Sequence, residues 1–137
     1  MWLGPLAAAS YIADNWDSTV GGQLAMTRVR EQQPLGVIGV AAGASVWTER
    51  RAGRVWLDLV AGTRLVGRMA GLTAGPILEL DVLAHPRIGG SIGGWVHVGL
   101  TPYARIGWVH ELGMFAEIGV HLPLPVYRAK RSVSSAH

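Results

Sequence analysis

The sequence has no cysteine, one lysine (Lys130), and few charged residues of any kind, which make up 15% of its 137 positions. Without cysteine, the chain cannot form a disulfide framework, a thiolate nucleophile or a cysteine-based zinc site. A soluble domain of this size normally covers its surface with lysine and glutamate, and this chain has too few of either to do so. The low charge and the 19 glycines also exclude disorder of the polar, highly charged kind.

The sequence also lacks a hydrophobic run long enough for a membrane-spanning helix. The longest apolar or small stretch, from Leu35 to Trp47, is shorter than the roughly 20 residues that such a helix needs, and it contains glycine. The N-terminal segment MWLGPLAAAS has no basic region, and its hydrophobic run is too short for a secretory signal. If the protein is exported, we expect its signal peptide to be absent from this chain.

The sequence does contain an alternation of apolar and polar residues with a period of two, which indicates β-strands rather than helices. Turn signals such as Asp14-Asn15, His85-Pro86 and Thr101-Pro102 separate the alternating segments. We therefore expect eight strands, near residues 3–13, 16–30, 35–48, 54–66, 70–84, 88–100, 103–110 and 113–124.

In the last five of these segments, leaving aside the turn residue His110, every ionisable side chain falls on the face opposite the apolar one. That polar face also carries many glycines and several large aromatic residues, as expected for the crowded interior of a small barrel. The apolar face would promote aggregation in water, but in lipid it would be well solvated, and a closed barrel leaves no unpaired strand edge. The predicted interior polar network consists of Asp58, Arg64, Glu79, Asp81, His97, Arg105, Glu117 and His121.

The predicted fold class is all-β, an antiparallel up-and-down barrel of eight strands with its apolar face outward to lipid and its polar, glycine-rich face inward. Eight spanning strands of about 10 residues each would use about 80 residues. We expect one barrel domain over residues 1–124. A faint repeat of Gly4-Pro5 at Gly75-Pro76 leaves open two four-stranded halves, about 1–67 and 70–124. Residues 125–137 are predicted to be a basic, disordered tail.

Segments such as GRVWLDLVAG and GMFAEIGVHLPL give the chain a pattern that resembles the small eight-stranded outer-membrane barrels of Gram-negative bacteria. The resemblance covers about residues 16–124. It implies a location in the bacterial outer membrane, with the lipid bilayer or detergent as partner. It also implies an aromatic girdle, for which the candidates are Trp16, Trp47, Tyr103 and Trp108. The chain departs from the pattern at Pro76, which would cost a ladder hydrogen bond unless a strand begins there.

The function we expect is a structural role in membrane integrity, because eight strands leave no wide pore and short connections provide no long recognition loops. One alternative is a soluble, lipocalin-like barrel that binds a small apolar ligand, with Leu57, Leu80, Val96 and Ile118 pointing inward. A second alternative is an outer-membrane lipid acyl hydrolase with a serine, a histidine and an acid. Its candidate serines are Ser18, Ser45 and Ser91, and no local motif singles one out.

We expect no enzymatic activity, and the sequence identifies no catalytic, cofactor-binding or metal-binding residue. Glu117 and His121, for example, lie about 13 Å apart along a strand and cannot share a metal by themselves. The isoelectric point near 10.0 does not indicate nucleic-acid binding, because the arginines are scattered and form no stripe. Association of two chains into a homo-oligomer stays open.

Overall fold

A computed structural model of the chain describes residues 1–30, 35–65, 68–81 and 85–126. Its strands are β1 (Trp2–Ile12), β2 (Asn15–Val29), β3 (Val37–Trp47), β4 (Ala52–Leu65), β5 (Arg68–Asp81), β6 (His85–His97), β7 (Thr101–Val109), β8 (Gly113–His121) and the two-residue β9 (Leu124–Pro125). Among these residues there is no helix long and apolar enough to cross a membrane.

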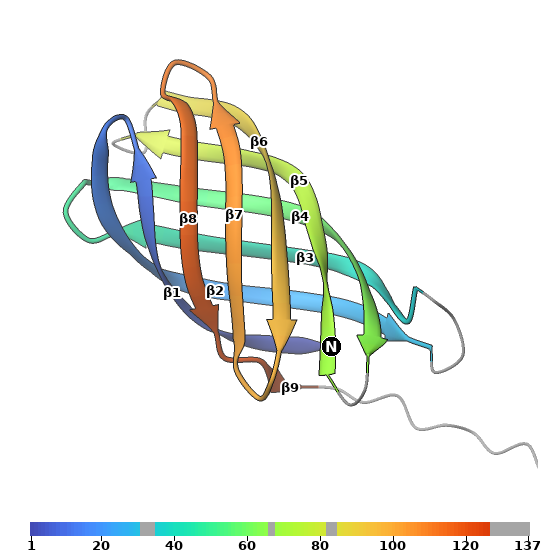
Figure 1. The fold of residues 1–137 in the computed structure, drawn as a ribbon. Coiled ribbons are helices and arrows are strands. Elements are labelled where there is room, and N and C mark those ends of the chain that lie inside the picture. The colour runs from blue at the N-terminus through green and yellow to red at the C-terminus, as the bar shows by residue number, and fades with distance from the viewer. Residues whose placement is uncertain (31–34, 66–67, 82–84, 127–137) are drawn as a thin grey trace, which may run out of the picture.

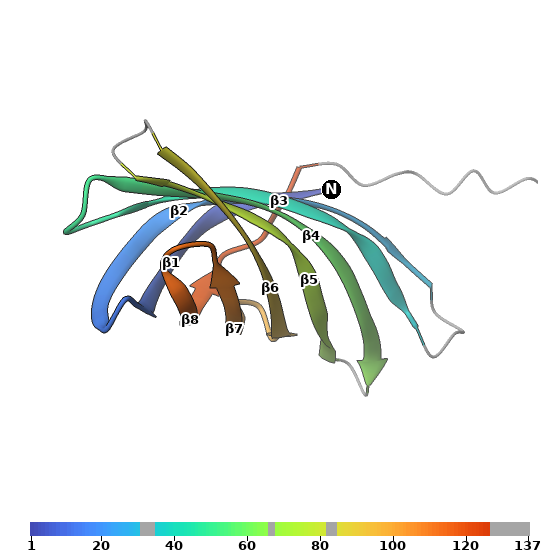
Figure 2. The same ribbon diagram turned by 90° about the horizontal axis from the view of Figure 1, so that it is seen from above.

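Each of the first seven strands pairs antiparallel with the next, and β1 closes the barrel by pairing with β8 (Figure 1). The closing ladder runs from Leu6 opposite His121 to Ile12 opposite Phe115. Figure 2 shows the curved wall that results. The predicted eight-stranded up-and-down barrel is therefore confirmed. It has two ends: the terminal end, where β1 begins and β9 lies, and the distal end, which carries the β1–β2, β3–β4, β5–β6 and β7–β8 connections.

The start of β1 pairs with β9, with Trp2 opposite Pro125. This short strand was not predicted, because two residues are too few to show any alternation. Pro125 was assigned to the tail and instead belongs to the sheet. The prediction of a disordered tail otherwise falls mainly on residues 127–137, which lie outside the described part of the chain.

Two predicted turns are wrong. His85-Pro86 begins β6 and Thr101-Pro102 begins β7. Proline is tolerated close to the start of a strand, where its missing N–H group costs little. Pro76 is different, because it lies within β5. The ladder between β4 and β5 lapses there, between the pair of Trp56 and Ile77 and the pair of Leu59 and Ala74.

Along each strand the side chains alternate between the interior and the outer surface. Leu59 and Ile118 are 70% and 63% exposed, whereas the neighbouring Asp58 and Glu117 are buried. The apolar face is therefore the outer face. The soluble alternative, which required Leu57, Val96 and Ile118 to point inward, is wrong, since all three are exposed; Leu80 is half-buried.

Glycine on the inner face makes room for aromatic rings. Four inward rings lie directly opposite a glycine of the neighbouring strand: Trp56 opposite Gly43, Trp95 opposite Gly71, Tyr103 opposite Gly119 and Phe115 opposite Gly107. A Cβ atom on any of these glycines would lie less than 3.0 Å from a ring carbon. The alternation of glycine and aromatic residues across the strands is thus a packing requirement of a narrow interior.

Candidate functional site in the barrel interior

Arg54 lies at the centre of a buried ionic cluster in the distal half of the barrel. Its Nε atom is 2.8 Å from Oε2 of Glu79, and its Nη1 atom is 2.7 Å from Oε2 of Glu117. Trp47 donates its indole N–H to Oε1 of Glu79 at 2.6 Å. The guanidinium group also lies over the ring of Phe115, 4.4 Å from its centroid. Aromatic rings and carboxylates therefore hold this cation on several sides.

A second ion pair lies further from the distal end than the cluster around Arg54. Nη2 of Arg105 donates to Oδ2 of Asp58 at 2.8 Å, and the Arg105 guanidinium lies 5.0 Å from the centroid of Trp56. Tyr103, two residues before Arg105 on β7, donates its hydroxyl to Oε1 of Glu117 at 3.2 Å. This hydrogen bond connects the surroundings of Arg105 to the cluster of Arg54, Glu79 and Glu117. Each buried carboxylate thus has at least one charged or polar donor, which is the condition under which buried charges are tolerated.

The two clusters fill the cross-section of the barrel together with apolar side chains. Ile12, Ile77, Val109 and Phe115 are buried in the distal half and pack in one cluster with Trp47. A conducting path would have to break ion pairs that are shielded from water.

The residues of the predicted interior network lie in three parts of the barrel: the buried interior, the terminal end and the distal rim. Asp58, Glu79, Arg105 and Glu117 are buried and form the ion pairs just described, and the side chain of His121 is also buried. His97 lies half-buried nearer the terminal end.

Two members of that prediction are wrong. Arg64 is exposed at the terminal end, and Asp81 lies at the distal rim, where its Oδ2 is 2.9 Å from Nη1 of Arg87. Both have the inward parity, but they lie at strand ends, where the barrel wall no longer encloses a side chain. Arg54, the central cation, was missed. It shares the parity of Trp56 and Asp58, so extending the β4 alternation by one position would have found it.

The predicted aromatic girdle needs a similar correction. Trp47 and Tyr103 point inward and hydrogen-bond to Glu79 and Glu117, so they are not girdle residues. Proximity to a strand end suggested them, but parity decides the side of the wall on which a residue lies.

Trp16 and Trp108 do point outward, with 63% and 49% of their surface exposed, and both lie near the distal end. Tyr11, which was not predicted, lies beside Trp16, with the ring centroids 5.4 Å apart. The outward aromatics thus gather near one end of the barrel.

The terminal half of the interior is hollow. A cavity of about 110 Å³ lies between the two tryptophans Trp2 and Trp95, the hydroxyls of Thr73 and Thr101, and Arg105 at its inner end. Nδ1 of His97 is 2.9 Å from Oγ1 of Thr101, and the His97 ring lies 6.3 Å from that of Trp2. An aromatic wall with a few polar groups is typical of a small-molecule site.

The serines proposed for a hydrolase do not form a catalytic pair. In the part of the chain that the structure describes, no hydrogen bond joins Ser18, Ser45 or Ser91 to a histidine. Ser45 is buried and Ser18 is exposed. The described residues also bring together no group of three or more histidine, aspartate and glutamate side chains that could hold a metal ion.

No family model matches the sequence, and no curated protein matches it either. Two solved structures share its fold. A designed transmembrane β-barrel is 16% identical, with a TM-score of 0.56 over 90% of this chain and 95% of that one. The outer membrane enzyme PagL is 11% identical, with a TM-score of 0.59 over 90% of this chain and 99% of that one. The predicted resemblance to outer-membrane barrels is confirmed at the level of the fold.

The prediction that the chain is not an enzyme is overturned by this comparison. It rested on the absence of any local motif or spacing that identifies a catalytic residue, and PagL is an outer membrane enzyme with the same fold. A small barrel is therefore no argument against catalysis. At 11% identity, the likeness shows the fold and carries no activity over to this chain.

Proposed function

We propose that this chain, which has the fold of a transmembrane barrel, is an integral protein of the bacterial outer membrane with a structural role in membrane integrity. The observation that carries the proposal is the sorting of side chains. On the outer wall, apolar residues such as Leu59, Leu72 and Ile118 are largely exposed, while the ion pairs of Arg54 and Arg105 lie inside. Such a wall is stable in hydrocarbon, and its closed ladder satisfies the backbone there.

The interior supports a role that does not involve transport. The cluster of Arg54, Glu79 and Glu117 closes the distal half, so we expect the barrel to span the membrane without conducting ions. A transport protein of this width would need a lumen, and eight strands provide none.

The proposal is tested by folding the protein into phosphatidylcholine vesicles loaded with a self-quenched dye. We expect folding only with detergent or lipid present, a barrel that resists added protease, and no dye release beyond that of empty vesicles. A folded monomer in plain buffer would contradict the membrane location. Sustained dye release or single-channel steps in a planar bilayer would contradict the plugged interior.

A second candidate function is the binding of a small molecule in the cavity of the terminal half. The distal half is packed with large side chains, whereas about 110 Å³ stays open between Trp2 and Trp95. The charge of Arg105 at the inner end is balanced by Asp58 at 2.8 Å, while Nε and Nη1 of Arg105 have no hydrogen-bond partner among the described residues and can donate to an oxygen atom of a ligand. We infer a ligand that is uncharged, with an apolar ring and one or two hydroxyl groups.

Indole NMR signals can test this second candidate, with phenol and cyclohexanol as probes. A saturable shift of the Trp2 and Trp95 signals is expected, while the outward Trp16 and Trp108 report unspecific partitioning into detergent. Ala25→Phe, which fills the cavity, should abolish the saturable shift, and Ala44→Phe on the outer wall should not. Equal, linear shifts of all four signals would rule out a site.

A further inference from the structure

The outer face of β2 changes character at one point near the terminal end. Val20, Leu24 and Met26 face outward and are exposed, and the next two residues of the same parity are Arg28 and Arg30. Arg28 lies opposite the outward Ile38 of β3, so its stem lies beside apolar surface while its guanidinium is exposed. An apolar stripe that ends in arginine is the pattern of a side chain reaching from the edge of a membrane towards its headgroups.

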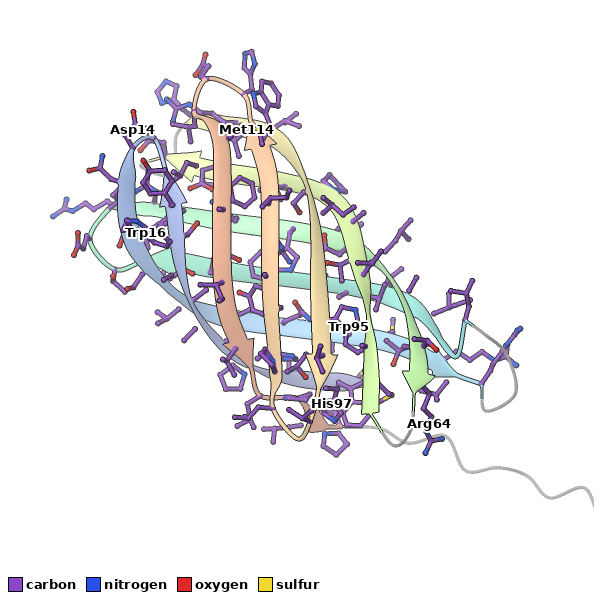
Figure 3. All side chains as sticks on the ribbon, in the orientation of Figure 1. Asp14, Trp16, Arg64, Trp95, His97 and Met114 are labelled. Atoms are coloured by element: carbon purple, nitrogen blue, oxygen red, sulfur yellow. The ribbon has the colours of Figure 1, made fainter. Side chains whose placement is uncertain are left out.

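A third arginine, Arg64, lies near these two at the terminal end of the barrel. The backbone N–H of Arg30 donates to the carbonyl of Gly36 at 2.7 Å. A Cβ atom on Gly36 would lie 3.5 Å from the backbone nitrogen of Arg64. Arg64 is exposed, and Figure 3 shows it at the terminal end, away from Asp14, Trp16 and Met114 at the distal end. Arg28 and Arg30, named here the basic corner, share the outward parity of Met26, whereas Arg64 has the inward parity.

The charges of the chain are divided unequally between the two ends. The distal end has five acidic residues and three arginines: Asp14, Asp17, Glu49, Asp81, Glu111, Arg50, Arg51 and Arg87. The charged side chains that the structure describes at the terminal end are those of Arg28, Arg30 and Arg64. The distal end therefore has a net formal charge of −2 (3 − 5), whereas the charged side chains described at the terminal end are all positive.

The aromatic residues are divided in the opposite way. The exposed outward aromatics Tyr11, Trp16 and Trp108 all lie near the distal end. Among the described residues, the corresponding outward positions near the end of β2 carry arginine instead. The two margins of the apolar wall are therefore chemically different, and each suits a different membrane interface.

We propose that the basic corner is a binding site for the phosphate groups of anionic lipids in the leaflet that surrounds the terminal end. The proposal rests on the membrane location proposed above. Arginine presents several N–H donors in a fixed plane, which matches a phosphate oxyanion, and it stays charged at every physiological pH. A basic residue near an anionic membrane surface gains about fivefold in affinity.

A matched pair of variants tests the site. Arg28→Gln with Arg30→Gln removes two positive charges from the basic corner, and Arg50→Gln with Arg51→Gln removes two from the distal end. Native mass spectrometry of each barrel in micelles doped with phosphatidylglycerol or phosphatidylcholine measures the affinity of the first bound lipid. The unchanged protein should prefer phosphatidylglycerol. The corner variant should lose about 25-fold of that preference, and the distal variant should keep it.

A competition measurement and a further variant separate the possible outcomes. Inorganic phosphate at millimolar concentration is added as a competitor; displacement of the lipid would show a site for free phosphate rather than for a headgroup and would overturn the proposal. Equal preference for the two lipids, or equal losses in both variants, would overturn it as well. Failure to fold in either lipid would instead refute the membrane location, so the two proposals fail in distinguishable ways. Arg28→Gln, a single change at an exposed position, provides a second test if the double variant does not fold.

Discussion

Gly43 of β3 and Trp56 of β4 lie directly opposite one another, and the indole ring of Trp56 occupies the position that a side chain at residue 43 would take. The ring lies across the neighbouring strand and reaches the Arg105 guanidinium, whose carbon is 5.0 Å from the ring centroid. A glycine on one strand therefore helps to position a cation that is contributed by another.

Replacing Gly43 with alanine should destabilise the barrel by about 1–3 kcal/mol, because the new methyl group meets both the Trp56 ring and the backbone carbonyl of Gly22. Urea unfolding in vesicles measures the change. Gly22→Ala is the matched control, since its Cβ would meet only the carbonyl of Gly4, at 3.5 Å. Combining Gly43→Ala with Trp56→Ala should cost less than the sum of the two single changes. Strict additivity would contradict the proposed contact.

Replacing Arg54 with methionine should cost about 3–5 kcal/mol, because Glu79 and Glu117 would lose their shared cation while buried. Arg54→Lys should recover only part of the loss, since one ammonium group cannot reproduce the fork of donors. The control is Arg87→Met at the distal rim, where the ion pair with Glu111 is exposed to solvent and a much smaller loss is expected. Equal losses at the two sites would show that the interior cluster is not sealed from water.

An arginine placed on the outer wall should be costly in proportion to its depth. Leu59→Arg in the middle of β4 should lose about 2–4 kcal/mol in a bilayer, whereas Met114→Arg at the distal margin should lose about 0–1 kcal/mol. Both native side chains are strongly exposed, so packing inside the barrel does not explain the difference. The measurement is reversible unfolding in vesicles. No dependence on depth would mean that the wall faces water.

The β7–β8 turn carries a carboxylate that titrates unusually. Arg87 donates a hydrogen bond to Glu111 at 2.9 Å, and this bond lowers the pKa of the Glu111 carboxyl below its ordinary value. The contact therefore stabilises the turn above the ordinary carboxyl pKa, and its contribution is lost as the pH falls through the lower pKa of the folded state. Carbon-detected NMR titration should show a depressed midpoint for Glu111 that returns to normal in Arg87→Gln. A normal midpoint in the unchanged protein would contradict the ion pair.

The fold could be predicted because period-two alternation is a local property. Each of the strands from Arg54 onward assigns its own side chains to two faces, and the absence of charge on one face decides which side meets lipid. The alternation does not show how far along the barrel axis a residue lies. Asp81 and Arg64 have the inward parity but lie where the wall ends, and Tyr103 lies near a strand end but on the inward side.

The pairing inside the barrel could not be predicted from the sequence. Arg54 meets Glu117 across 63 positions of the chain, and that contact exists only after β1 has closed on β8 in one particular register. A shift of that register by two residues would pair each arginine with different partners while leaving every face assignment unchanged. The cavity was missed for a similar reason, since Trp2 and His97 face one another only in the closed barrel.

The pairing of β1 with both β8 and β9 gives the strands a cyclic order. The backbone N–H of Val126 donates to the carbonyl of Met1 at 3.1 Å, so the first and last described residues lie side by side. In a ring, no strand needs to come first. A circular permutant that links residue 126 to Met1 and opens the chain between β4 and β5 would keep every neighbour in the sheet, with the basic corner then lying beside the new chain ends.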